Sequence, residues 1–221
     1  PDWIENHYTE AKLKKSVRGG GNRRSRQIEF RLPAGAAYVE RVKERRKQQA
    51  AFSELEPRLT KAIGECASRK MTNLEFWQHF WKLWAEHRSR FQGSGLQISG
   101  KRANWRHACQ ALVAILDNSR KGITNGRLDD VVAGEIDRLQ VEDNPVRKAW
   151  LSEMLCHYMP DRYPVLNGPV SKWLSENKLN PVSRGTDGRK YIEISRTLRK
   201  VLETKPSGAR NLAELDNVIW L

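Results

Sequence analysis

The sequence has no long hydrophobic run and few cysteines, and each shortage excludes a class of protein. Its richest apolar stretch, residues 108–116, spans nine positions and includes a glutamine, whereas a membrane-spanning helix needs about 20 consecutive apolar residues. The three cysteines, Cys66, Cys109 and Cys156, are widely spaced and lie within apolar helical patterns. That distribution argues against a disulfide framework and against a clustered metal site. We therefore expect three buried thiols, no bound metal and no membrane partner.

The N-terminus lacks a methionine, and it also lacks the basic-then-apolar order of a signal peptide. We expect a cytoplasmic protein and a chain that is a fragment or a processed form. An allowance of roughly 150 residues per domain makes the 221 residues one large domain or two small ones.

Positive charge is abundant and unevenly distributed. The chain has 40 Lys and Arg against 26 Asp and Glu, a formal net charge of +14, and such a surface attracts polyanions. Residues 11–47 contain 13 basic and three acidic side chains, whereas residues 117–143 contain seven acidic and four basic ones. The sequence therefore predicts one basic side, and a surface formed by 117–143 that avoids phosphate.

The most basic segment has little potential for regular structure. Residues 16–27 combine three consecutive glycines with Arg23, Arg24 and Arg26, a composition that resists both helix and strand. We expect a mobile loop there. Residues 27–32 then alternate polar and apolar side chains and stop at Pro33, which predicts one short, half-buried strand with no evident partner.

The remaining chain has helical spacing. An apolar stripe through Arg69 predicts two helices divided near Ser53, which has capping-box spacing to Glu56. Thr72 and Glu75 repeat that spacing before the strongest helical pattern of the chain. We expect its tryptophans to be core residues rather than base-stacking platforms, and its apolar face to consist of Leu74, Trp77, Phe80, Trp81 and Trp84.

These patterns predict a mostly α-helical, multi-helix protein with at most one short strand or hairpin near residues 27–32. A Gly/Ser-rich stretch at 93–100 favours two helical units. The first, 1–92, would be a basic N-terminal helical region with the mobile Arg/Gly loop. The second, 101–221, would be a C-terminal helical domain.

Motifs of enzyme active sites are scarce. The glycines at 19–21 are not followed by the Gly-Lys-Ser/Thr ending of a Walker A loop, and His79 and His87 have no cysteine at zinc-ligand spacing. Asp129 and Asp130 lie in an acidic stretch rather than beside a lysine. We assign no catalytic residue, no metal ligand and no cofactor. A nuclease with an unrecognised site stays an alternative.

Arginines near polar and aromatic residues are the feature of the sequence that indicates nucleic-acid binding. Phosphate contacts supply most non-specific affinity for nucleic acid, and Arg suits bidentate contacts with phosphate or guanine. The arginines of 23–26 would order on a backbone or enter a minor groove. Those of 101–106 straddle a helix start, where backbone N–H groups attract anions. The candidate nucleic-acid-binding residues are Arg23, Arg24, Arg26, Lys101, Arg102, Arg106, Arg162, Tyr163, Asn167, Lys172, Arg184, Arg189, Lys190 and Arg196.

The proline-bounded loop 160–169 is the candidate for specificity. Pro160 and Pro164 stiffen a segment that carries Arg162, Tyr163 and Asn167 into the next helix. A stiff loop holds side chains in one geometry, which reading a base or a modified group requires. The alternative is that Tyr163 and Asn167 only pack and cap the loop.

Two C-terminal segments resemble known proteins. Residues 155–174 contain Pro-Asp-x-Tyr-Pro-x-x-Asn between two helices, and residues 211–220 contain Leu-x-x-Leu-Asp-x-x-x-Trp. This pattern resembles helical accessory or DNA-binding regions of bacterial restriction and phage-defence proteins, including those associated with modified-cytosine restriction GTPases. The GTPase motifs are absent, so the resemblance implies an accessory or DNA-binding region.

The sequence thus leads to a nucleic-acid-binding helical module of a bacterial defence or restriction system, with DNA preferred and RNA as an alternative. A second hypothesis is an interaction subunit that docks a motor or nuclease partner. Salt dependence separates the two, because phosphate contacts weaken steeply with salt.

Overall fold

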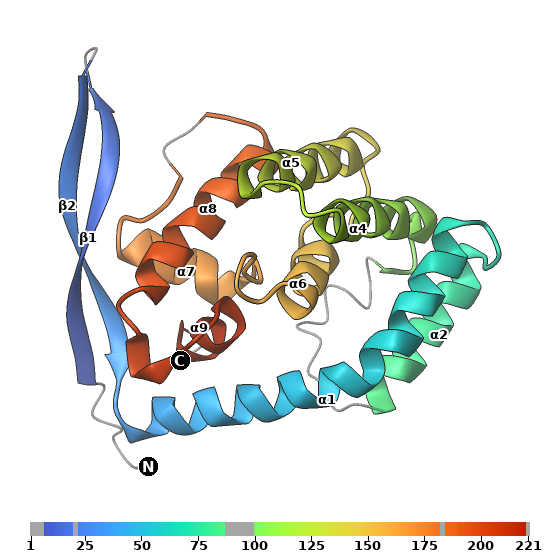
Figure 1. Cartoon of the computed structure of the whole chain (residues 1–221), viewed down its shortest axis with the longest axis horizontal. Helices are drawn as coiled ribbons and strands as arrows, with labels where there is room; N and C mark the ends of the chain where they lie inside the picture. Colours follow the sequence, from blue (N-terminus) through green and yellow to red (C-terminus); the bar gives the residue numbers. More distant parts are fainter. Residues whose placement is uncertain (1–6, 20–21, 87–99, 182–183, 220–221) are drawn as a thin grey trace.

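The computed structural model describes residues 7–19, 22–86, 100–181 and 184–219, with side chains at 30–32, 35–84, 100–181 and 184–219. Eight α-helices and one two-stranded antiparallel sheet make up these residues. The expected mostly α-helical, multi-helix fold is confirmed. In Figure 1 the sheet stands along one side of the helical body rather than inside it.

The basic N-terminal segment forms a long hairpin instead of a mobile loop. Strand β1 (His7–Gly19) pairs with β2 (Asn22–Ala34), with Leu13 opposite Ile28 in the register. The expectation of a loop at 16–27 is therefore wrong for 16–19 and 22–27, and positions 20–21 lie outside the described residues. The strand expected at 27–32 exists, but it is longer and has a partner. Pairing of the two neighbouring strands overrode the poor local propensity, as strand formation depends strongly on context.

Helix α1 (Ala36–Ala67) is continuous where two helices were expected. Ser53 does not cap a second helix, because its hydroxyl donates to the carbonyl of Gln49 at 3.4 Å within the same helix. Pro57 lies inside α1, where its ring removes one backbone hydrogen bond and bends the helix. Figure 1 shows the resulting change of direction along α1.

Helix α2 (Asn73–Glu86) begins with the expected capping box. The backbone N–H of Thr72 donates to the Glu75 carboxylate at 2.8 Å, and the N–H of Glu75 donates to the Thr72 hydroxyl at 3.2 Å. Trp77 and Trp84 are buried, as expected. The placement of Leu74 on the buried face is wrong, since that residue is 64% exposed. The buried side chains of α2 lie at positions 76, 77, 80, 83 and 84, and position 74 lies off that face of the helix.

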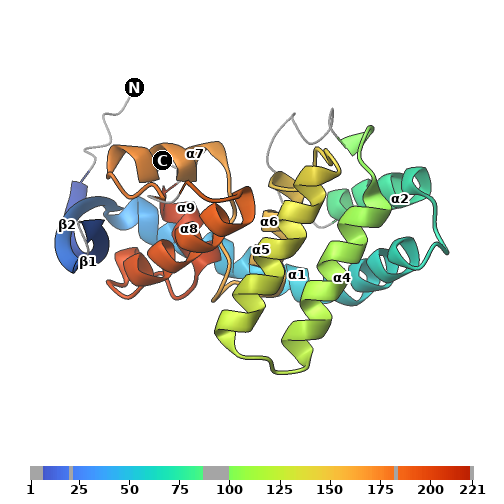
Figure 2. The ribbon, with the colours of Figure 1, turned by 90° about the horizontal axis from the view of Figure 1, so that it is seen from above.

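The C-terminal half is a succession of shorter helices, which Figure 2 shows from above. They are α4 (Trp105–Arg120), α5 (Asn125–Val141), α6 (Ala149–Tyr158), α7 (Gly168–Glu176), α8 (Asp187–Leu202), the short 3-10 helix η1 (Pro206–Gly208) and α9 (Leu212–Ile219).

The two largest hydrophobic clusters join most of these elements. The larger one combines residues 52–84 with residues 103–192, so that segments on both sides of 93–100 share one core. The second joins Phe30 and Leu32 of β2 to α7, α8 and α9. The three cysteines are buried free thiols, as expected. None of the described helices has the length and apolar content that crossing a membrane requires.

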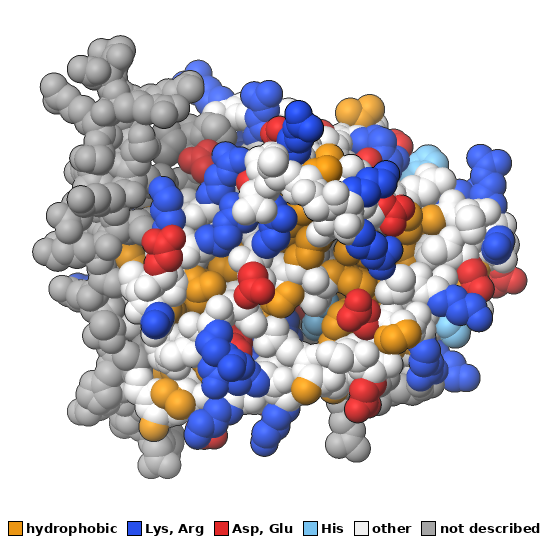
Figure 3. Space-filling view, viewed as in Figure 1, with side chains coloured by type: hydrophobic (Ala, Val, Ile, Leu, Met, Phe, Trp, Pro, Cys, Tyr) orange, Lys and Arg blue, Asp and Glu red, His pale blue; other side chains and the backbone are white. Residues whose placement is uncertain are grey.

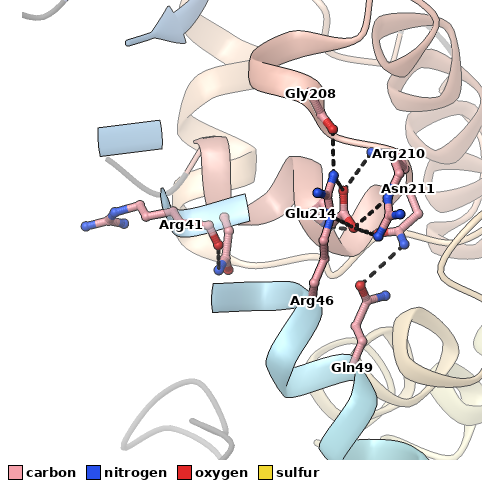
Figure 4. Close-up of polar contacts among 8 residues, drawn as sticks. Arg41, Arg46, Gln49, Gly208, Arg210, Asn211 and Glu214 are labelled. Atoms are coloured by element: carbon pink, nitrogen blue, oxygen red, sulfur yellow. Dashed lines mark hydrogen bonds and ion pairs between the residues drawn. The ribbon is translucent and has the colours of Figure 1, made fainter. Parts of the chain in front are cut away.

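A buried glutamate fastens α1 to α9. The carboxylate of Glu214 has no exposed surface and lies 2.9 Å from Nε of Arg46. It also accepts the backbone N–H of Arg210 at 2.8 Å, while Nη2 of Arg46 donates to the Gly208 carbonyl at 2.9 Å. Figure 4 shows these groups converging, with Arg41 pointing away from them. Arg46 therefore has a structural role, although it belongs to the basic run of α1.

Candidate nucleic-acid interface

The β1–β2 hairpin concentrates positive charge. Residues 7–34 contain eight Lys and Arg against two Glu. The register places Lys15 opposite Arg26 and Arg18 opposite Arg23. Like charges directly opposite each other destabilise a strand pair. The register therefore pairs basic positions of the two strands in this half of the hairpin.

The other half of the hairpin is fixed to the helical body. The Phe30 ring meets the Trp173 ring edge-on, with centroids 6.2 Å apart. The indole N–H of Trp173 donates to the Arg31 carbonyl at 2.9 Å, and the Arg31 backbone N–H donates to the Asn177 side chain at 2.7 Å. These contacts tie β2 to α7 at both polar backbone groups of Arg31. An isolated two-stranded ribbon is only marginally stable in water. Contacts with the helical body therefore stabilise this hairpin and fix its position.

A second group of arginines surrounds the buried carboxylate of Asp129 on α5. Oδ2 of Asp129 lies 2.9 Å from Nη2 of Arg196 and 3.6 Å from Nη2 of Arg199, both on α8. The guanidinium of Arg162 lies over the Tyr163 ring, with Cζ 5.6 Å from its centroid, and donates to the Asn125 carbonyl at 3.2 Å. Figure 3 shows Lys and Arg side chains gathered over α8 on this face.

Tyr163 does not reach the surface, so its inclusion among the nucleic-acid contacts is wrong. The residue has no exposed area, and its hydroxyl donates to Oδ1 of Asp129 at 3.1 Å. Burial, and then the neighbouring Asp129 carboxylate, raise the pKa of this phenol well above its ordinary value. The ring packs against Tyr191 at 6.3 Å. Tyr163 therefore supports Asp129 from the interior.

Asn167 is a helix cap. Its Oδ1 accepts the Val170 backbone N–H at 2.8 Å at the start of α7, and its Nδ2 donates to Asp216 at 2.8 Å. Both ends of the amide are thus used inside the protein. The expected role of loop 160–169 in reading a base has no support from Tyr163 or Asn167, because one is buried and the other caps a helix. Arg162 is the member of the three whose charged end lies at the surface.

The start of α4 is capped from within. The Arg106 backbone N–H donates to the Asn73 side chain at 2.8 Å, and the His107 N–H donates to Asn104 at 3.3 Å. Those N–H groups are therefore not available to an anion, contrary to expectation. Lys101 and Arg102 are exposed just before this helix, and Arg106 is half-buried.

The other predicted contacts lie on β2, on α7 and at or near the start of α8. Lys172 on α7 pairs with Glu176 at 3.8 Å. Arg184, Arg189 and Lys190 lie at or before the first turn of α8 and are exposed. Arg23, Arg24 and Arg26 lie in β2. The structure thus brings Arg162 and Arg196 together around Asp129 and Arg199. Lys101 and Arg102 are exposed charges before a different helix.

Asp129 is the functional candidate that the sequence analysis missed. It was interpreted as part of an acidic, phosphate-avoiding stretch. However, positions 129, 132 and 136 share one helix face, and the latter two are apolar. That spacing was the available signal that Asp129 points inward and needs a partner.

The next feature of the structure is its potential metal ligands and two buried titratable groups, Cys156 and His157. No three His, Cys, Asp or Glu side chains there are arranged to hold a metal ion. Burial raises the pKa of the Cys156 thiol to about 12, which keeps it protonated. Burial also lowers the pKa of His157, whose Nε2 lies 3.2 Å from Glu153.

Comparisons with known proteins were negative. No protein-family model, no curated protein and no solved structure matches this chain.

Proposed function

We propose that this protein binds nucleic acid, duplex DNA in particular, through phosphate contacts made by the β1–β2 hairpin. The observation that carries the proposal is the hairpin register, which places basic residues opposite basic residues at Lys15/Arg26 and Arg18/Arg23. Like charges at directly opposite positions destabilise the free hairpin. A bound polyanion would reverse that effect.

The shape of the hairpin supports a groove-binding role. A two-stranded ribbon fits the major groove of B-form DNA, and basic arms of this kind also enter minor grooves. Each strand has 13 residues, which at about 3.3 Å per residue gives about 43 Å, longer than one helical turn of DNA, about 34 Å. The anchor at Arg31 holds such a ribbon in a fixed direction relative to the body.

The biological setting belongs to the same proposal. The resemblance of residues 155–174 and 211–220 to restriction and phage-defence proteins supports a reader or targeting module that works beside a motor or nuclease subunit. In that setting the chain supplies binding and the partner supplies catalysis.

The test is a titration of a fluorescent duplex of about 20 base pairs at several salt concentrations between about 50 and 200 mM. The variant combines Arg23→Gln, Arg24→Gln and Arg26→Gln. The control combines Lys61→Gln, Lys70→Gln and Lys82→Gln, which removes three exposed charges from α1, from α2 and from the turn between them.

We expect the parent to bind with a steep salt dependence. In the hairpin variant the slope of log K against log salt, which is negative, should become less steep by about 0.9 for each phosphate that the protein no longer neutralises. The control should change the slope less. A parent that does not bind duplex or single-stranded nucleic acid at low salt, or a hairpin variant equal to the control, overturns the proposal.

A further inference from the structure

The arginines around Asp129 carry more positive charge than their surroundings neutralise. Among the described residues, Asp129 provides the carboxylate contacts within 4 Å of Arg196 and Arg199, and Arg162 contacts a carbonyl and a ring instead. One carboxylate thus contacts two guanidinium groups, and the guanidinium of Arg162 has neutral partners. Each guanidinium has five N–H donors, more than these contacts use.

Hydrogen bonds hold the side chains of this cluster in place. Asp129 is 3% exposed, and its two oxygens are divided between an interior donor, Tyr163, and the surface arginines. Arg199 is also held by a 3.1 Å bond from Nη1 to the carbonyl of Arg162. Side chains fixed in this way lose little rotational freedom when they bind. Arg196 nevertheless keeps 56% of its side chain exposed.

The cluster and the hairpin belong to one part of the molecule. Phe30 and Leu32 of β2 lie in the same hydrophobic cluster as Ile194 and Leu198 of α8. In Figure 1 and Figure 2, α8 lies between the hairpin and α5. A long polyanion that lies along the hairpin therefore has α8 as its next neighbour on the body.

We propose that Arg162, Arg196 and Arg199 form a second phosphate-binding point, so that one duplex contacts the hairpin and this cluster together. Asp129 is a positioning residue, which aims Arg196 and Arg199 outward. Planar guanidinium groups match the geometry of a phosphate, to which they bind bidentately. This inference rests on the proposed function and adds the ligand class, a duplex that is long enough to reach both points.

The test variant combines Arg162→Gln and Arg196→Gln, leaving Arg199 to neutralise Asp129 and preserve the fold. The matched control combines Lys61→Gln and Lys82→Gln, two exposed charges on α1 and α2. All proteins are first compared by thermal unfolding, and binding is measured at a temperature where each is folded. The probes are a duplex of about 20 base pairs and a single strand of the same sequence.

We expect the double arginine variant to bind the duplex roughly tenfold or more weakly at about 0.1 M salt, with a slope lowered by about 2. Its binding stoichiometry should stay at one duplex per chain, and the control should bind as the parent does. A second variant, Arg162→Lys with Arg196→Lys, keeps the charge and should recover most of the slope.

Three results overturn the inference. The first is that the Arg162→Gln, Arg196→Gln variant binds as the Lys61→Gln, Lys82→Gln control does, while the hairpin variant loses affinity. In that case the proposed function still stands. The second is a loss of affinity for the single strand equal to that for the duplex. The third is that the parent protein binds two duplexes per chain, because the hairpin and the arginine cluster would then bind separate duplexes rather than one.

Discussion

The buried carboxylate of Asp129 accepts a 3.1 Å hydrogen bond from the hydroxyl of Tyr163. The same carboxylate pairs with Arg196, whose side chain is more than half exposed. An interior contact and a surface charge are thereby joined through one residue. The loop that carries Tyr163 and the helix that carries Arg196 meet at this point.

Tyr163→Phe tests the interior half of this junction. It keeps the packed ring but removes the donor to a charged oxygen, so we expect a loss of about 2 kcal/mol in the free energy of unfolding. Tyr158→Phe is the matched control, because the Tyr158 hydroxyl is 2.9 Å from the neutral hydroxyl of Thr60. Its loss should be nearer 1 kcal/mol. Urea unfolding measures both, and equal losses would contradict a special role for Asp129.

Glu214→Gln tests the tie between α1 and α9. Burial raises the pKa of Glu214, but the hydrogen bonds from Arg46 and Arg210 outweigh burial and hold that pKa below its ordinary value. The ionised form is therefore the stabilising one, and we expect the variant to lose about 2 kcal/mol. Glu40→Gln, which breaks an exposed pair with Lys43, should cost less than about 1 kcal/mol. If the two variants unfold at the same urea concentration, the tie is unimportant.

His157 predicts a loss of stability in mild acid. Burial lowers its pKa in the folded protein, only partly offset by Glu153, so the unfolded chain binds the proton more readily. Stability should therefore fall as the pH drops below the ordinary imidazole value, about 6.5, towards the folded pKa. We expect the decrease in Tm between pH 7 and pH 5 to be smaller in His157→Gln than in the parent. The exposed His79→Gln is the control, and a parent-like pH profile in His157→Gln would refute the assignment.

Asn177→Ala tests the anchor of the hairpin. The Arg31 backbone N–H loses its acceptor, so amide hydrogen exchange at residues 30–32 should become faster while exchange in α4 is unchanged. Asn118→Ala removes a comparable amide contact, to the Ala114 carbonyl at 2.8 Å within α4. That control should leave residues 30–32 protected. Unchanged exchange at these residues in Asn177→Ala would mean that the anchor lies elsewhere.

Patterns of local origin were the ones that the sequence predicted well. The capping box of Thr72 and Glu75 and the buried Trp77 and Trp84 depend on neighbours three or four positions away. Those spacings are visible in one sequence. The helical class of the fold follows from the same kind of signal.

Features that depend on distant segments were missed. The partner of residues 27–32 lies nearer the N-terminus, beyond a glycine run that looked like a loop. The sequence left open whether Tyr163 reads a base or packs the loop, because its partner, Asp129, is 34 positions away, and the structure confirms the packing alternative. The sequence did not distinguish Arg46 from the other basic residues of 11–47, because its partner Glu214 is 168 positions away. Such pairings are decided by packing, which periodicity along the chain does not contain.

The contact between α5 and α8 depends on a glycine. Gly188 lies in the first turn of α8, where its backbone N–H donates to Asp137 at 2.8 Å. A Cβ at this position would lie 2.7 Å from the Cα of Ala133 on α5, against backbone that cannot move aside alone. Gly188→Ala should therefore push α8 away from α5 and cost about 2 kcal/mol.

Gly134→Ala is the matched control for that substitution. Gly134 lies inside α5, next to Ala133, and a Cβ there meets no atom within 4 Å. The added methyl group should stabilise the protein by about 0.5–1 kcal/mol, because alanine restricts the unfolded chain and favours a helix. Urea unfolding should thus shift in opposite directions for two identical chemical changes on facing helices. If Gly188→Ala is as stable as Gly134→Ala, then α5 and α8 are not packed closely enough to hold Asp129 against Arg196, and the second phosphate-binding point loses its support.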